Sequence, residues 1–255
     1  GGGHGHPDKL SFVLYARVRR VAVDPGTRAY GSPVHAGWDK TTFAHNTLVA
    51  DGSSQKESTG RCLAFGSDQG VDYVVADAGP IYDGLRFVRA VALVGEKLLV
   101  FVDRVEAKET RTLDLLWHQR GAWVDPPARL AWNPPDEPGY RYVKDGWEEK
   151  DGAGVALSCR DGDLATVFAV APGEAPTLLI GTGIGNNTED RVPLAVLRRK
   201  AASTVFAWAV SLDGAAPKLE GQARPDGYEL SVKHAGKTAR VTVSTDGRSV
   251  RIEAF

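Results

Sequence analysis

The sequence predicts an all-β fold of antiparallel sheets packed face to face, a multi-sheet, supersandwich-like β-sandwich. Its short apolar segments are rich in Val, Leu, Ala and aromatic residues, and Gly, Pro, Asp or Asn bound each of them. No window keeps an apolar period of 3.6 residues over the length of an ordinary helix. Strand and helix patterns do not alternate as a parallel α/β fold requires, so that class is disfavoured.

Strands are expected, in chain order, at residues 9–16, 19–23, 46–50, 61–65, 73–76, 85–93, 97–105, 112–118, 139–143, 155–159, 165–170, 177–180, 194–199, 204–212, 228–233, 239–244 and 249–255. The dipeptides Asp161-Gly162 and Asp246-Gly247 suit tight hairpins, because glycine tolerates the positive φ that such turns need. The Pro-rich segment 125–139 is expected to form a loop.

The chain of 255 residues is long enough for one large all-β domain. Gly, Ala and Pro concentrate over residues 213–226, which suggests a boundary there. We therefore expect a main sandwich over 1–212. Residues 213–255 would form either a small terminal sheet or the last strands of the same sandwich.

Composition excludes several classes of function. With 31 basic and 32 acidic residues the chain has no global basic field, so nucleic acid is not an expected partner. No apolar run approaches the ~20 residues that span a bilayer. Cys62 and Cys159 allow either one bridge or two buried thiols. No methionine occurs, even at position 1, and we therefore expect a piece of a longer protein.

The first eight residues, Gly-Gly-Gly-His-Gly-His-Pro-Asp, gather groups that bind metals or move protons. His4, His6 and Asp8 stand at i, i+2 and i+4, and an extended backbone would point them to one side. Imidazole and carboxylate groups that converge suit a metal site or a proton-transfer site. An expression tag is disfavoured because the motif runs directly into the alternating residues 10–15.

Three segments in order, GGGHGHPDKLSF, VAVDPGTRAYG and TTFAHNTLVADG, resemble the start of the β-sandwich domain of the heparinase II/III-like polysaccharide lyases. Weaker agreement continues to about residue 200. The resemblance implies β-elimination on uronic-acid glycans, by a bacterial protein that is periplasmic or secreted. In that reaction the substrate carboxylate is neutralised, a base removes the C5 proton, and an acid protonates the departing 4-oxygen.

The resemblance also implies a structural zinc ion. The matching ligand positions are His6, Asp24 and His45. Two imidazoles and a carboxylate are a credible zinc set, with a fourth place for water or another group. The alternative is that both histidines are ordinary polar residues bonded to backbone.

His4 matches the family's catalytic histidine, as base or as neutraliser of the carboxylate, and Tyr30 is a candidate residue of the cleft. Trp38 could stack on a sugar, and His118 could face the cleft as part of an aromatic-His pair; packing is the alternative for both. The resemblance places the remaining catalytic groups in an N-terminal helical toroid, which nothing here matches. We expect that toroid upstream and expect this chain to be inactive alone.

Two other functions stay open. A cupin-like metal enzyme also opens with an His-x-His pair, but it usually has a glutamate a few residues later, and here the first glutamate is Glu57. A non-catalytic carbohydrate-binding sandwich would show exposed aromatic residues and would not need His4, His6, Asp24 and His45 to converge. The sequence does not select one uronic-acid polysaccharide.

Overall fold

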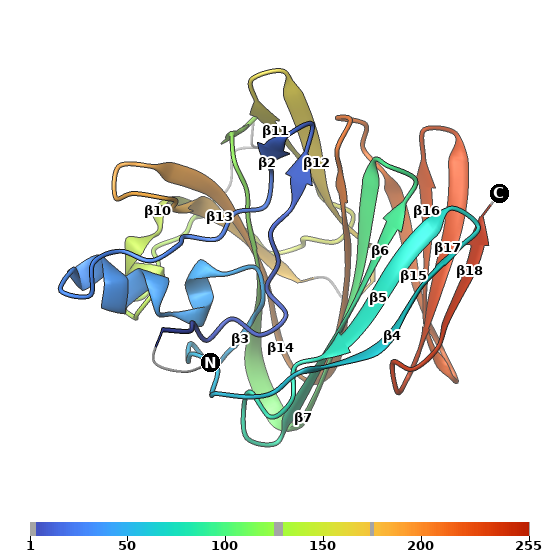
Figure 1. Ribbon diagram of the computed structural model, residues 1–255, viewed down its shortest axis with the longest axis horizontal. Coiled ribbons are helices and arrows are strands. Elements are labelled where there is room, and N and C mark those ends of the chain that lie inside the picture. The colour runs from blue at the N-terminus through green and yellow to red at the C-terminus, as the bar shows by residue number, and fades with distance from the viewer. Residues whose placement is uncertain (1–3, 125–129, 174–175, 255) are drawn as a thin grey trace.

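The computed structural model describes residues 4–124, 130–173 and 176–254, and strands dominate it (Figure 1). Within these ranges a large sheet has twelve strands, a terminal sheet has four, and a small hairpin has two. The strands are β1 (Tyr15–Ala16), β2 (Arg19–Arg20), β3 (Leu48–Ala50), β4 (Arg61–Asp68), β5 (Val71–Asp77), β6 (Leu85–Val94), β7 (Leu98–His118), β8 (Ala122–Trp123), β9 (Leu130–Ala131), β10 (Lys144–Glu149), β11 (Ala156–Asp161), β12 (Leu164–Val170), β13 (Thr177–Ile184), β14 (Arg191–Ser211), β15 (Lys218–Arg224), β16 (Gly227–His234), β17 (Lys237–Ser244) and β18 (Val250–Ala254). The described helical turns are η1 (His35–Asp39), η2 (Thr42–Ala44) and η3 (Tyr140–Tyr142).

The two longest strands, β7 and β14, form the backbone of the large sheet. They pair antiparallel from end to end, with one register shift between Ala201 and Ser203. The first half of β7 also pairs with β6 and its second half with β3, whereas β14 pairs first with β13 and then with β12. The large sheet therefore has two parts, one with β6 and β12 and the other with β3 and β13, and the strands β7 and β14 run through both.

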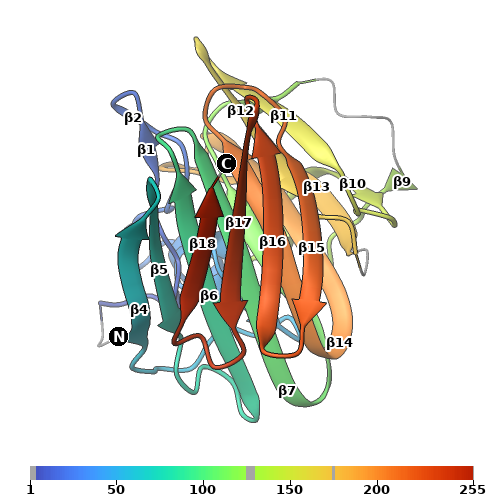
Figure 2. The same cartoon turned by 90° about the vertical axis from the view of Figure 1, so that its right-hand side faces the viewer.

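Both faces of the central strands are covered, which explains their nearly continuous apolar sequence. Along β6, Phe87 belongs to a core that includes Trp117 and Trp208, and Leu10 and Phe12 of the opening segment pack against it. Alternate residues of β6 belong to a second core, shared with the terminal sheet β15–β18. Figure 2 shows that terminal sheet lying across the large one.

A buried ion pair ties the opening segment to the large sheet. Arg89 on β6 and Asp103 on β7 are 4% and 0% exposed, and Arg89 Nε donates to Asp103 Oδ1 at 2.7 Å. Arg89 Nη1 also donates to the carbonyls of Leu10 and Asn46 at 2.8 and 2.6 Å. The guanidinium thus has partners in the sheet and in two other segments, and it joins the opening segment to β6 and β7.

Some strand boundaries differ from the prediction. Residues 9–16 were expected to be a strand, but only Tyr15–Ala16 pairs; the carbonyl of Lys9 instead accepts a hydrogen bond from the Thr47 hydroxyl. The strand predicted over 139–143 is wrong: η3 follows Gly139, whose φ is +82°, and Tyr140 is buried there. Cysteines 62 and 159 are both free thiols, the first exposed and the second buried.

Of the loop predicted over 125–139, residues 125–129 lie outside the described residues, and β9 occupies part of the rest. A four-stranded sheet begins at Lys218, one strand earlier than expected. Its apolar side chains share a core with β6 and β7, and a domain division at residue 213 stays a prediction. No helix in the described ranges is both long and apolar enough to cross a membrane.

Candidate metal and acid-base site

The segment His45-Asn46-Thr47, between η2 and β3, fixes the opening residues over the sheet. Asn46 is fully buried, and its Nδ2 donates to the carbonyls of Phe12 and Val23 at 3.2 and 3.1 Å. Its Oδ1 accepts the backbone N–H of His118 at 2.6 Å. One amide side chain therefore joins three segments that are distant in sequence, and this arrangement holds His45 in place.

Three side chains with metal-binding atoms meet at this point. The donor atoms of Asp8, Asp24 and His45 all lie within 4.8 Å of one another. His45 Nδ1 is 2.9 Å from Asp24 Oδ2, and the rings of His6 and His45 have centroids 5.2 Å apart. Two of the three predicted ligands, Asp24 and His45, therefore meet here together with Asp8. His6 lies beside them, with its Nε2 hydrogen-bonded to the Thr27 hydroxyl at 3.0 Å.

The partners of the two ring nitrogens of His45 suit a metal ligand. Its Nε2 lies 3.1 Å from the carbonyl oxygen of Asp39, and its Nδ1 faces the Asp24 carboxylate, so both ring nitrogens face acceptors. A neutral imidazole carries one N–H. Without a metal, Nδ1–H donates to Asp24. With a metal bound, the proton would be on Nε2, bonded to the Asp39 carbonyl, and Nδ1 would face the ion together with the Asp24 carboxylate. The donor set therefore fits zinc.

Electrostatics keeps two of these groups in the form that binds metal. Burial alone would raise the pKa of Asp24, but hydrogen bonds from His45 and from the Gly26 N–H outweigh it and hold the pKa below its usual value. Burial, and then the nearby His45, lower the pKa of His6. Asp24 is therefore ionised and His6 is neutral near pH 7.

Asp39 organises the loop that carries Asp24. Its side chain is fully buried and accepts hydrogen bonds from the backbone N–H of Arg28, at 2.8 Å, and from the Arg28 guanidinium. Arg28 Nη2 also donates to the carbonyl of Gly185 at 2.6 Å. Since the Asp39 carbonyl also contacts His45, one residue positions both the loop and the imidazole.

His4 and Tyr30 form a second cluster at the surface. The Tyr30 hydroxyl is hydrogen-bonded to His4 Nδ1, and the Tyr30 ring lies 4.7 Å from that of His35. Tyr30 is 61% exposed and His4 is also exposed. These two residues therefore present an imidazole and a phenol to solvent. Residues 4–8 are not a strand, and His4 has other partners than His6, which contacts Thr27 and His45.

Trp38 and His118 are buried, which favours the packing alternative over contact with a sugar. Trp38 has no exposed surface, and its indole N–H donates to the carbonyl of Ile184 at 3.0 Å. His118 is 1% exposed, and burial lowers its pKa to about 3. A Cβ at Gly183 would approach an indole carbon of Trp38 to 2.7 Å, so glycine is required for this packing.

Asp39 was not predicted as a site residue, and Asp8 was predicted only as part of the opening motif and not as a member of the zinc ligand set. Asp8 stands in the opening motif, so its spacing from His4 and His6 was a signal for it. Asp39 is the last residue of η1 and acts through its buried side chain and its carbonyl. No motif marks such a residue in the sequence.

Comparison with known proteins places this chain in a family. The family model described as "Heparinase II/III-like, C-terminal" matches residues 1–253. An exo-oligoalginate lyase of Saccharophagus degradans is 32% identical over 148 residues, which are 49% of this chain and 20% of that protein.

The solved structures agree on the fold. A heparan sulfate lyase, HepC, of Pedobacter heparinus superposes with a TM-score of 0.74 at 18% identity, covering 96% of this chain and 38% of that one. A heparinase III structure gives 0.68 at 16% identity, covering 99% and 36%. The chain thus spans between a fifth and two fifths of the length of these relatives. The match also argues against the cupin-like alternative. The chain belongs to the heparinase II/III-like family and has the fold of its C-terminal β-sandwich.

Proposed function

We propose that this chain is the β-sandwich portion of a lyase that cleaves uronic-acid glycans by β-elimination. The observation that carries the proposal is the convergence of Asp8, Asp24 and His45, with the His6 ring 5.2 Å from that of His45, in a chain whose opening segment also carries the exposed His4–Tyr30 pair. A sandwich that only binds carbohydrate would not need this convergence. The family match supplies the reaction class.

Zinc would be held by His45 and Asp24, with His6 and Asp8 beside them as the other two donors. When bound, it would supply a fixed charge that joins the opening segment to two later loops. It would not take part in the chemistry. The bond between His45 and the Asp39 carbonyl would orient the ligand ring.

The exposed pair would handle protons. During β-elimination the C5 proton passes to a base, its electron pair forms the C4–C5 double bond, and the 4-oxygen leaves with a proton. The hydrogen bond between His4 and Tyr30 lets one proton be shared between an imidazole and a phenol. His4 would serve as the base or neutralise the C5 carboxylate, and Tyr30 would line the cleft and orient His4.

The remaining catalytic groups would come from residues outside this chain, in the helical toroid expected from the family. The relative with 32% identity makes oligoalginate the first substrate to test, and heparan sulfate the second. A periplasmic or secreted location is part of the same proposal.

Turnover tests the proposal directly. The longest natural protein that contains this sequence is assayed on oligoalginate and heparan sulfate by the ultraviolet absorbance of the unsaturated product. His4→Ala should lower kcat by a factor of ~10² or more, because general acid-base groups contribute that much. His234→Ala, on the terminal sheet, is the matched control and should retain activity. Turnover of the His4 variant at the wild-type rate would refute the assignment.

A further inference from the structure

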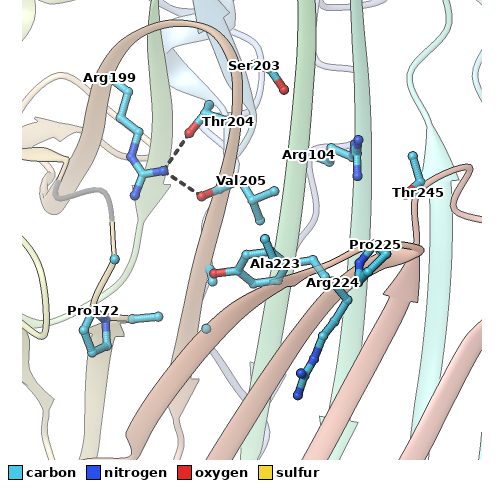
Figure 3. A pocket seen from close by; sticks show the side chains of 16 residues that line it. Arg104, Pro172, Arg199, Ser203, Thr204, Val205, Ala223, Arg224, Pro225 and Thr245 are labelled. Atoms are coloured by element: carbon cyan, nitrogen blue, oxygen red, sulfur yellow. Dashed lines mark hydrogen bonds between the residues drawn. The ribbon is translucent and has the colours of Figure 1, made fainter.

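The arginines that line the largest described pocket already have partners in the protein. Arg104 and Arg224 are each ion-paired to a glutamate, at 2.8 and 2.7 Å. Arg199 donates to the Thr204 hydroxyl and to the Val205 carbonyl, as Figure 3 shows. These side chains therefore bind partners within the two sheets. A buried group that the proposed function does not use lies in η1 instead.

This group is the imidazole of His35, which is buried and lacks a hydrogen bond at one nitrogen. His35 is 8% exposed, and no described residue bonds to its Nδ1. That atom faces Asp39 Oδ2 at 3.7 Å, which is too long for a hydrogen bond. Because an unpaired buried nitrogen destabilises a fold, packing alone does not account for a histidine at this position.

Two turns bring His35 against Tyr30. The Ser32 N–H donates to the Ala29 carbonyl at 2.8 Å, and the His35 N–H donates to the Ser32 carbonyl at 3.0 Å. Pro33 lies inside the second turn, and its fixed φ suits the start of a turn or helix. The chain thereby folds back, and the rings of Tyr30 and His35 lie 4.7 Å apart with 36° between their planes.

The turn η1 brings the side chains of His35 and Asp39 together. The Lys40 N–H donates to the His35 carbonyl, five residues earlier, at 2.9 Å. A turn of this kind is wider than an α-helical one, and such turns are frequent at functional sites. Asp39 is fully buried and accepts hydrogen bonds from Arg28. His35 therefore has its Nδ1 edge toward a fixed carboxylate and its ring against that of Tyr30.

We propose that His35 is a positioning residue, which holds the Tyr30 phenol at His4 through contact between the two rings. Tyr30 is 61% exposed, and an exposed tyrosine would otherwise sample several rotamers. Contact with a buried ring favours the rotamer in which the Tyr30 hydroxyl bonds to His4 Nδ1. The part that this pair plays in turnover rests on the proposed function, whereas the positioning rests on the ring contact alone.

Nitrogen-15 NMR of this chain tests the positioning without an assay of turnover. At mildly alkaline pH, where imidazoles are neutral, the chemical shift of His4 Nδ1 reports its hydrogen bond to Tyr30. Tyr30→Phe gives the value without that bond. His35→Gln removes the aromatic ring and should move the shift most of the way to that value. His35→Leu, which also lacks the ring, should do the same, so the comparison does not depend on the folding of one variant.

His35→Phe keeps a ring in contact with Tyr30 and should move the His4 shift much less than His35→Gln does. His234→Gln, on the terminal sheet, is the matched control and should leave the shift unchanged. The wild-type shift in both His35→Gln and His35→Leu would overturn the proposal. Equal displacement in His35→Phe and His35→Gln would overturn it as well, because the ring would then not be the cause.

Turnover of the longest natural protein that contains this sequence gives a second test. His35→Gln should lower kcat by a factor of ~10, because small displacements of a catalytic group are costly, and KM should change by less than about twofold. In a Tyr30→Phe background the same substitution should have almost no effect, since His35 acts through the phenol. An equal loss in both backgrounds would overturn the proposal. A displaced His4 shift in a protein without lyase turnover would retain the positioning role and reject the proposed function.

Discussion

Replacing Asn46 with alanine should destabilise the chain by about 3 kcal/mol. The side chain is fully buried and makes three hydrogen bonds to backbone groups, those of Phe12, Val23 and His118. Each lost bond costs about 1 kcal/mol, and more where the abandoned group stays buried and unpaired. The opening segment should also become more mobile, because two of these bonds hold the carbonyls of Phe12 and Val23.

Urea unfolding followed by circular dichroism measures this loss as a lower midpoint at constant m-value. Asn133→Ala is the matched control: it removes the same side chain at an exposed position and should change the free energy of unfolding by less than about 0.5 kcal/mol. Limited proteolysis should cut the opening segment faster in the Asn46 variant. A destabilisation below about 1 kcal/mol would refute the view that Asn46 joins the three segments.

Three further predictions concern packing, pH and thiols. Gly183→Ala should destabilise by about 1–3 kcal/mol in thermal unfolding, because the new Cβ would lie 2.7 Å from a buried indole carbon; Gly31→Ala, with no atom within 4 Å, should be nearly neutral. The pKa of His118 falls from 6.5 to about 3 on folding. The stability that the folded chain gains from keeping this imidazole neutral is therefore complete above pH 6.5 and is lost as the pH falls toward 3. Over this range the free energy of unfolding falls by about 1.4 kcal/mol per pH unit, or about 2 kcal/mol between pH 7 and 5. This pH dependence should be weaker in His118→Gln. Ellman's reagent should react with Cys62 alone in the folded chain and with both thiols after unfolding, because Cys159 is buried and its pKa is raised to about 12; fast reaction of both in the folded state would contradict this.

Most of the fold could be predicted because its signals are local. Short apolar segments between turn residues predicted most of the described strands, and a turn does follow Asp161 and join β11 to β12; β8, β9, β10 and β15 had no predicted counterpart. The strand β15 was missed because its sequence, Lys-Leu-Glu-Gly-Gln-Ala-Arg, is largely exposed and contains only one large apolar residue, Leu219. The strands predicted at 97–105 and 112–118 form one continuous strand, β7. The sequence did not show this, because the residues between them are mostly polar and lie near solvent although they continue the strand.

The site was predicted only in part, for a related reason. The ordered motifs pointed to Asp24 and His45, which are in contact, and to His6, whose ring lies 5.2 Å from that of His45; metal binding by them stays a prediction. Whether Trp38 faces a sugar or the core is decided by Gly183, 145 positions later, whose missing side chain opens the space for the indole. Such a contact depends on how distant segments pack, and no local pattern records it.

The central claim is that the three converging segments hold zinc, and metal content measures this most directly. The chain is purified, dialysed without chelator and analysed by mass spectrometry together with His45→Ala and His4→Ala. We predict close to one zinc per chain in the wild type and in His4→Ala, and little in His45→Ala, with thermal stability lost together with the metal. A folded wild-type chain without zinc, or zinc that is retained in full by His45→Ala, would contradict the account.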